Sequence, residues 1–247
     1  MNTAVPPKSE SMWNRIKKIL LPKDRFESDL RFEKKFQIPV NELPQLELRL
    51  ARYGCSPIHE PRWINNLYCD THDYQHLYEN IEGLSNRKKL RFRWYGEKNG
   101  ELKITAEYKI KIDDTNTKES QKIGVIPFES KTTLQNLFDT CIQAWESCAY
   151  PSSHVPQNYT PTLLNRYYRK YYLNADDNIR LTIDTPIYYE NAATGIKAIQ
   201  EDWAIVELKC PKNHIIHGDL MPYQLNKSSK YVDGLQMTDP LFEQSSI

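Results

Sequence analysis

In Leu90-Arg91-Phe92-Arg93-Trp94-Tyr95, charged and apolar side chains alternate along a stretch that is rich in aromatic residues. Side chains of a β-strand point alternately to its two faces, so the two arginines share one face and the apolar side chains share the other. One strand of this kind is typical of a sheet face exposed to solvent. The pattern indicates a charged interior only if it recurs in other strands of the same domain.

The alternation does recur, from the start of the chain to near its end, in Arg31–Phe36, Ile104–Ile110, Arg180–Asp184 and Val206–Lys209. The residues Gly96–Gly100 separate two of the strands and predict a hairpin. Strands outnumber helices, of which Lys131–Ala149 is the clearest, and this predicts an α+β fold. Charge on the inward faces of several strands predicts an antiparallel β-barrel that closes around a tunnel, with peripheral helices.

A lumen lined by cations requires an anionic ligand. Two like charges about 6 Å apart repel by roughly 3 kcal/mol at an effective dielectric constant near 20. Polyphosphate supplies many negative charges, and arginine and lysine bind its oxygens through charge-assisted hydrogen bonds. A few carboxylates in the same lumen are typical of a site for a divalent metal that bridges phosphates.

The composition excludes several other classes of protein. The formal net charge is +1, which argues against a protein that coats nucleic acid. Arg87–Lys89, with aromatic residues nearby, nevertheless keeps an RNA-binding protein as an alternative. The chain has 8 glycines and neither of the common glycine-rich nucleotide-binding motifs. Its 5 cysteines form no C-x-x-C motif, so we expect unpaired thiols in a reducing cytoplasm.

The first 28 residues are expected to form a separate leader, partly loose or containing a short amphipathic helix. Apolar and basic residues alternate at helical spacing in Ser11–Leu21. Such a segment packs on its own domain or docks on a membrane surface or a membrane protein. No apolar run is long enough to cross a membrane.

Four motifs, Arg31–Phe36, Leu90–Gly96, Val206–Lys209 and Ser228–Tyr231, resemble in this order those of the VTC domain. This is the polyphosphate polymerase branch of the triphosphate tunnel metalloenzymes. The resemblance covers about Leu30 to Leu235, and we expect the tunnel domain to comprise residues 29–247. It implies a cytoplasmic transferase that uses a divalent metal, Mn²⁺ or Mg²⁺. The enzyme would move the terminal phosphate of ATP onto a growing inorganic polyphosphate chain.

The resemblance also implies a role for individual residues. Lys35 and Lys230 match the catalytic lysines, and Glu207 matches the metal-binding glutamate. The implied substrate-binding residues are Arg91, Arg93, Lys109, Lys118, Arg169 and Arg180. Lys122 is an alternative to Lys118, and Arg166 is an alternative to Arg169.

The triphosphatase branch of the superfamily carries an E-x-E-x-K signature that would need an acid where this chain has Arg31. Only Glu33 and Lys35 of that signature remain, which favours the polymerase branch. A tripolyphosphate or nucleoside triphosphate hydrolase with the same fold stays an alternative, as does a polyphosphate-binding module without activity. The resemblance also implies that a membrane protein could be a partner, which would place the enzyme at the inner face of a membrane.

Overall fold

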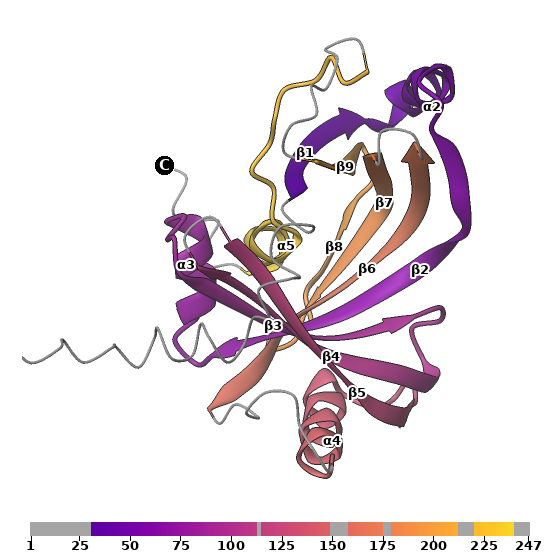
Figure 1. Cartoon of the computed structure of the whole chain (residues 1–247). Coiled ribbons are helices and arrows are strands. Elements are labelled where there is room, and N and C mark those ends of the chain that lie inside the picture. The colour runs from indigo at the N-terminus through magenta and orange to yellow at the C-terminus, as the bar shows by residue number, and fades with distance from the viewer. Residues whose placement is uncertain (1–30, 113–114, 149–157, 175–178, 212–219, 240–247) are drawn as a thin grey trace, which may run out of the picture.

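The computed structural model describes residues 31–112, 115–148, 158–174, 179–211 and 220–239, and these form one antiparallel sheet with four α-helices (Figure 1). The strands are β1 (Arg31–Pro39), β2 (Ser56–Thr71), β3 (Arg87–Tyr95), β4 (Gly100–Ile112), β5 (Thr115–Phe128), β6 (Tyr159–Asn174), β7 (Ile179–Asn191), β8 (Lys197–Gln200) and β9 (Trp203–Pro211). The helices are α2 (Leu43–Arg52), α3 (Gln75–Ile81), α4 (Leu134–Glu146) and α5 (Lys230–Thr238). The predicted combination of many antiparallel strands with few helices is confirmed.

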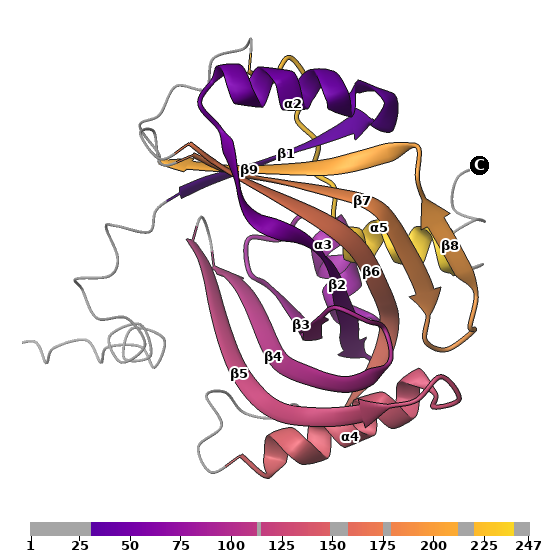
Figure 2. The same cartoon turned by 90° about the vertical axis from the view of Figure 1, so that its right-hand side faces the viewer.

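The strands lie in the order β1-β9-β7-β6-β2-β3-β4-β5, with β8 added to β7. The sheet curves so strongly that β3–β5 face β1 and β9 across an interior (Figure 2). The prediction of a closed barrel is wrong for the described residues, because β1 pairs with β9 but not with β5 at the other end. The free edge of β1 pairs instead with the segment before α5, where Asn226 N donates to Lys35 O at 2.8 Å.

Helices cover the outer face of the sheet in two places. The apolar side chains of β3 are buried beneath α4, where Phe92 packs edge-on against Phe138 and Trp145. Helix α2 buries Leu46 and Leu50 against the outer side chains of β1, β7 and β9. Burial of these alternate side chains removes apolar surface from water and leaves their charged neighbours on the inner face.

Helix α5 packs on the inner face instead. Tyr231 and Leu235 are buried there against apolar side chains of β2, β6, β7 and β9, including Ile64, Leu163 and Ile187. Gly234 allows this close approach, because a Cβ at this position would overlap Tyr189 Cδ1 and Leu163 Cδ2. The helix therefore fills one part of the concave face and leaves the charged part open.

We predict that Gly234→Ala destabilises the protein by about 1–3 kcal/mol, the usual cost of forcing an extra methyl group into a packed interface. The better helix propensity of alanine offsets about 1 kcal/mol at most. Urea unfolding measures the effect, with Gln236→Ala on the exposed side of α5 as the control. A variant as stable as the wild type would show that α5 does not pack this closely.

Candidate active site

Glu107 of β4 is the first of three carboxylate centres on the inner face. It is 4% exposed. It accepts a hydrogen bond from Arg91 Nε at 2.8 Å and forms an ion pair with Arg91 Nη2 at 2.7 Å. Arg93 Nη1 lies 3.5 Å and Lys118 Nζ 2.5 Å from the same carboxylate. The sheet register explains this arrangement, since Arg91 lies directly opposite Glu107. Burial raises the pKa of Glu107, but Arg91, Arg93 and Lys118 together outweigh it and lower the pKa to about 2.

Arg93 is oriented further by a chain of buried amides. Its Nε donates to Asn66 Oδ1 at 2.8 Å, and Asn66 Nδ2 donates to Asn165 Oδ1 at 2.7 Å. Both asparagines are fully buried. The guanidinium is thus held at the centre of the sheet while it keeps further N–H donors for a ligand.

Asp184 of β7 forms the second centre and is fully buried. Arg169 binds it through two parallel contacts, Nε to Oδ1 at 2.5 Å and Nη2 to Oδ2 at 2.7 Å. Lys230, the first residue of α5, places its Nζ 2.7 Å from Oδ2. Burial raises the pKa of Asp184, but the two cations outweigh it and lower the pKa.

The third centre joins β1, β4 and β9. Glu207 contacts Lys209 at 3.0 Å, and Glu33 lies 3.6 Å from the same Nζ. Glu33 also lies 3.5 Å from Lys109 and 3.7 Å from Lys35, so it links β1 to β4, the strand next to the other end of the open sheet. Burial raises the pKa of Glu207, but Lys209, Arg169 and Lys35 outweigh it and hold the carboxyl ionised at neutral pH.

Next to this third centre is a cavity of about 710 Å³, lined by residues of β1, β3, β4, α3 and α5 and of the segments beside the two helices. Six of its lining side chains are basic: Lys35, Arg87, Lys89, Lys109, Lys111 and Lys227. Three are acidic, Glu33, Glu82 and Asp233. This excess of cations in a confined space is the electrostatic signature of an anion-binding site.

Lys89 lines this cavity, and our sequence analysis did not select it as a site residue. Its Nζ donates to Ser229 Oγ at 2.8 Å, and burial, with Lys35, Lys109, Arg87 and Arg91 nearby, lowers its pKa well below the ordinary value. The signal was present in the sequence, because Lys89 precedes Arg91 by two residues and therefore shares its face.

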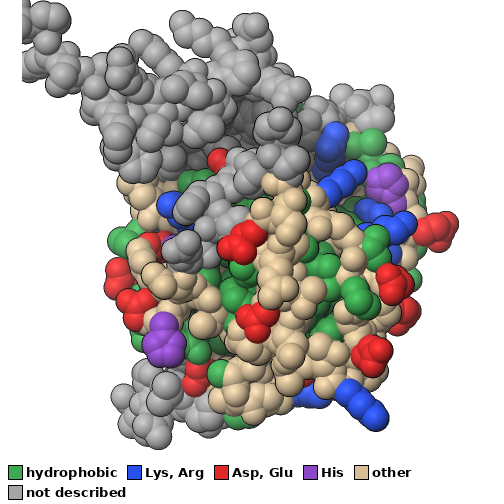
Figure 3. Space-filling model, turned by 90° about the horizontal axis from the view of Figure 1, so that it is seen from below, with side chains coloured by type: hydrophobic (Ala, Val, Ile, Leu, Met, Phe, Trp, Pro, Cys, Tyr) green, Lys and Arg blue, Asp and Glu red, His purple; other side chains and the backbone are tan. Residues whose placement is uncertain are grey.

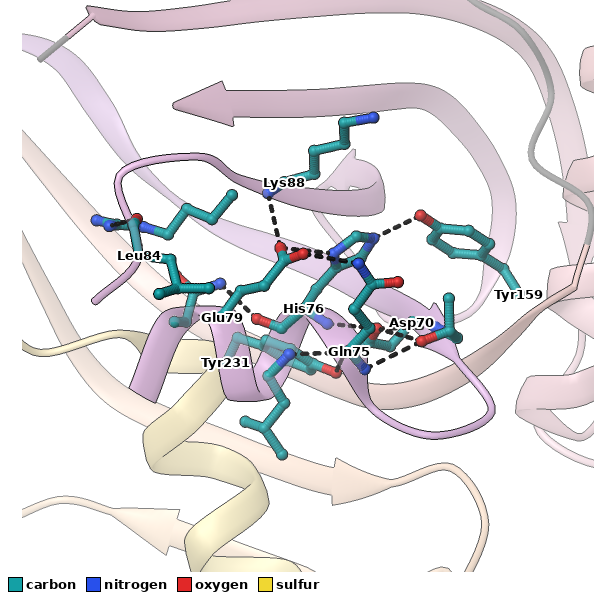
Figure 4. Close-up of polar contacts among 12 residues, drawn as sticks. Asp70, Gln75, His76, Glu79, Leu84, Lys88, Tyr159 and Tyr231 are labelled. Atoms are coloured by element: carbon teal, nitrogen blue, oxygen red, sulfur yellow. Dashed lines mark hydrogen bonds and ion pairs between the residues drawn. The ribbon is translucent and has the colours of Figure 1, made fainter. Parts of the chain in front are cut away.

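The helix that carries Lys230 is anchored by the next residue (Figure 4). The Tyr231 hydroxyl donates to Asp70 Oδ2 at 2.7 Å, and its ring stacks on Tyr68. Asp70 also accepts from the backbone N–H groups of His76 and Leu77 at 2.9 Å and so caps α3. One buried carboxylate therefore holds both helices that line the cavity.

Eight of the nine site residues that the sequence suggested form hydrogen bonds or ion pairs on the inner face: Lys35, Arg91, Arg93, Lys109, Lys118, Arg169, Glu207 and Lys230. Arg180 shares this face, two residues from Thr182 and four from Asp184, but is exposed at the end of β7. Lys118 contacts Glu107, whereas Lys122 lies farther along β5, opposite Thr105.

The two arginines of β6 lie on opposite faces. They are three residues apart, so alternation along the strand puts Arg169 on the inner face, where it binds Asp184, and Arg166 on the other face. Arg166 faces outward, with its guanidinium 4.1 Å from the centre of the Trp63 ring. The outer surface seen from below shows basic and acidic side chains interspersed with apolar ones (Figure 3). On that face, the described residues form no broad basic surface.

Glu207 is the carboxylate that best fits a divalent metal. Glu107 and Asp184 each form ion pairs with at least two cations. Within the described residues, Glu207 forms an ion pair with one cation, Lys209. No three His, Cys, Asp or Glu side chains in the described part of the chain are grouped to hold a metal by themselves. Mg²⁺-like ions commonly use one or two carboxylates together with substrate phosphates, and Glu207, with Glu33 nearby, suits this mode.

A family model of the VTC domain matches residues 30–238. The chain belongs to the VTC domain family. This family is a member of the triphosphate tunnel metalloenzyme superfamily, which implies a divalent metal, and its tunnel proteins in general bind nucleoside triphosphates and polyphosphate. No curated protein sequence matches this VTC domain significantly. The described part of the domain contains no helix long and apolar enough to span a membrane.

Solved structures show a distant likeness to this VTC domain. One is a Hippeastrum protein, described as a candidate adenylyl cyclase with a dominant triphosphatase activity (13% identity, TM-score 0.46, 88% of this chain and 97% of that chain). Another is a candidate adenylate cyclase of Vibrio parahaemolyticus (11% identity, TM-score 0.41, 74% and 78%). A third is a protein of Pyrococcus horikoshii (8% identity, TM-score 0.42, 82% and 99%). Because these identities and TM-scores are low, the family assignment rests on the match to the VTC family model alone.

We predict that Glu107→Gln flattens the acid side of the stability profile. The folded-state pKa of Glu107, about 2, lies below the ordinary value of 4.5. The ionised carboxylate therefore contributes stability above pH 4.5, and this contribution is lost as the pH falls toward 2.

Unfolding free energies between pH 2 and pH 7 test this prediction, with Glu101→Gln, an exposed glutamate on the same strand, as the control. The wild type should lose more stability across this range than Glu107→Gln does. Equal losses in both proteins would contradict the ion-pair centre.

Proposed function

We propose that this VTC domain is a metal-dependent polyphosphate polymerase that transfers the terminal phosphate of ATP to a growing inorganic polyphosphate chain. The observation that supports it best is the continuous inner face of cations. This face runs from the cavity at Lys35, Lys89 and Lys109 to the arginine pair of β3. A linear polyanion matches such a surface because it carries charge along its whole length.

The carboxylates organise the cations for this task. Arg91 uses Nε and Nη2 on Glu107, and Arg169 uses Nε and Nη2 on Asp184. Each guanidinium has five N–H donors, so phosphate oxygens can take the remaining ones without any loss of the internal ion pair. Arg93, Lys109, Lys118 and Arg180 add charge around the bound triphosphate.

Lys35 and Lys230 are proposed to flank the phosphate that is transferred. Lys35 Nζ donates to Ser228 O at 3.2 Å, and Lys230 follows two residues later, so the two lysines are held by adjoining segments. The acceptor is a phosphate end that is already ionised, and no strong general base is needed. Positioning and charge neutralisation by these residues supply most of the catalysis.

Glu207, with Glu33, would hold the divalent metal, which we propose to be Mn²⁺ or Mg²⁺. Bound there, the metal would neutralise phosphate charge during transfer. The apolar part of the inner face beneath α5 keeps water away from one side of the site, which favours transfer to the chain over hydrolysis.

We further propose that residues 29–247 form the tunnel domain, that residues 1–28 form a leader and that the enzyme works in the cytoplasm, where a membrane protein could receive the product. The leader lies outside the described residues. A reducing compartment is the expectation for a chain with 5 cysteines and no C-x-x-C motif.

Incubation with ATP and Mn²⁺, followed by a polyphosphate stain on a gel, tests the proposed reaction. Arg91→Ala should slow polymer formation by at least about a hundredfold, because it removes a preorganised donor to the phosphates. Arg166→Ala is the matched control, since this arginine stacks on Trp63 on the outer face. Release of free phosphate without polymer would instead indicate the hydrolase, and nucleotide binding without turnover would indicate a binding module.

We predict that Glu207→Gln weakens binding of Mn²⁺ in the presence of tripolyphosphate by at least about tenfold, since even outer-shell partners of a metal are worth that much. Electron paramagnetic resonance of free Mn²⁺ measures the affinity without any turnover. Glu201→Gln, an exposed glutamate before β9, is the control. Equal affinities in both variants would remove Glu207 from the metal site.

A further inference from the structure

Three side chains from three neighbouring strands form a stacked group on the inner face. Arg62 of β2 lies between two tyrosine rings, with its guanidinium carbon 4.4 Å from the ring centre of Tyr95 and 5.2 Å from that of Tyr171. Its Nε also donates to the Tyr171 hydroxyl at 3.1 Å. His59 packs edge-on against Tyr171, with ring centres 5.4 Å apart.

The position of this group relative to the phosphate-binding arginines is set by the strands. Tyr95 follows Arg93 by two residues on β3, and Tyr171 follows Arg169 by two residues on β6. Residues two apart share a face and are separated by roughly 7 Å along a strand. The ring of Tyr171 packs against the inner apolar cluster, which confirms that it faces inward.

The group lies at the other end of the arginine pair from the cavity. Along the inner face of β3 the order is Lys89, Arg91, Arg93 and Tyr95, and Lys89 lines the cavity. Along β3 the inner face therefore begins with a cation at the cavity and ends in an aromatic ring. A polyphosphate chain has no planar group that could stack on aromatic rings. A nucleoside triphosphate has phosphates at one end and a planar base at the other.

Packing alone does not account for the group. Tyr95 is 50% exposed and Arg62 is also exposed, so the Tyr95 ring contributes little to the core. A second arginine–aromatic group, Arg166 with Trp63, lies on the outer face, away from the phosphate-binding residues. The first group is thus distinguished by its place, two residues beyond Arg93 on β3 and directly opposite Arg169 on β6, beside arginines that would hold the phosphates.

We propose that Tyr95, Arg62 and Tyr171 form the stacking site for the base of the nucleoside triphosphate donor. Aromatic rings and guanidinium planes both stack on nucleobases, and such contacts tolerate different bases. The proposal rests on the proposed function, since it takes a nucleoside triphosphate as the donor. It gives the tunnel a direction: the donor enters from the Tyr95 side, and the polyphosphate chain extends toward the cavity at Lys89.

Binding measurements that need no turnover test the site. Calorimetry compares a non-hydrolysable β,γ-imido analogue of ATP with inorganic tripolyphosphate, which shares the phosphates but lacks the base. Tyr95→Ala should weaken binding of the analogue by about tenfold, which is within the range measured for one stacked base, while the affinity for tripolyphosphate stays the same. Tyr95→Phe keeps the ring and should bind the analogue as tightly as the wild type.

Tyr188→Ala is the matched control, because this tyrosine is 39% exposed but lies on the outer face. Equal weakening of both ligands by Tyr95→Ala, or no weakening of the analogue, would overturn the base site and leave the proposed function standing. Failure of the wild-type protein to bind either ligand would overturn the proposed function and this inference with it.

Discussion

The pairing of inward arginines with two buried carboxylates, Glu107 and Asp184, is the interaction on which the rest of this fold depends. A charged inner face would resist folding if its cations met only one another. Each carboxylate instead collects cations from different elements, Glu107 from β3 and β5 and Asp184 from β6 and α5. Either carboxylate alone would be costly to bury, and so would its arginine.

The sequence predicts that the inner cations need an external polyanion to offset their mutual repulsion. The structure shows that part of this repulsion is offset within the protein. Internal carboxylates neutralise the arginines at the centre, so the protein can fold before any ligand binds. The cations that line the cavity are less completely neutralised, and Lys89 and Lys109 have lowered pKa values there, for which burial is the leading cause. The proposed affinity for a polyanion would thus be strongest at the cavity, toward which the polyphosphate is proposed to extend.

Polar contacts also span the gap in the open sheet. Helix α5 and the segment before it lie across the gap, where Asn226 pairs with the edge of β1. Glu33 joins β1 to β4 through Lys109. Side chains and one inserted segment therefore do what hydrogen bonds between β1 and β5 would do in a closed barrel, and they bring Lys230 to the centre at the same time.

The alternation of charged and apolar residues in the sequence by itself determined which side chains share a face, because side chains point alternately to the two faces of a strand. The apolar face must be buried, and here helices cover it. The alternation placed Arg91, Arg93 and Glu207 on the inner face and predicted a mostly antiparallel sheet. Only the tertiary structure decided between Arg169 and Arg166, because residues three apart lie on opposite faces of a strand and the alternation does not say which face of β6 is the inner one. It also decided which cations meet each carboxylate, which brought Lys89 into the cavity and Tyr95 beside Arg62. Such contacts depend on strand order and sheet curvature, and these arise from packing between residues far apart in the chain.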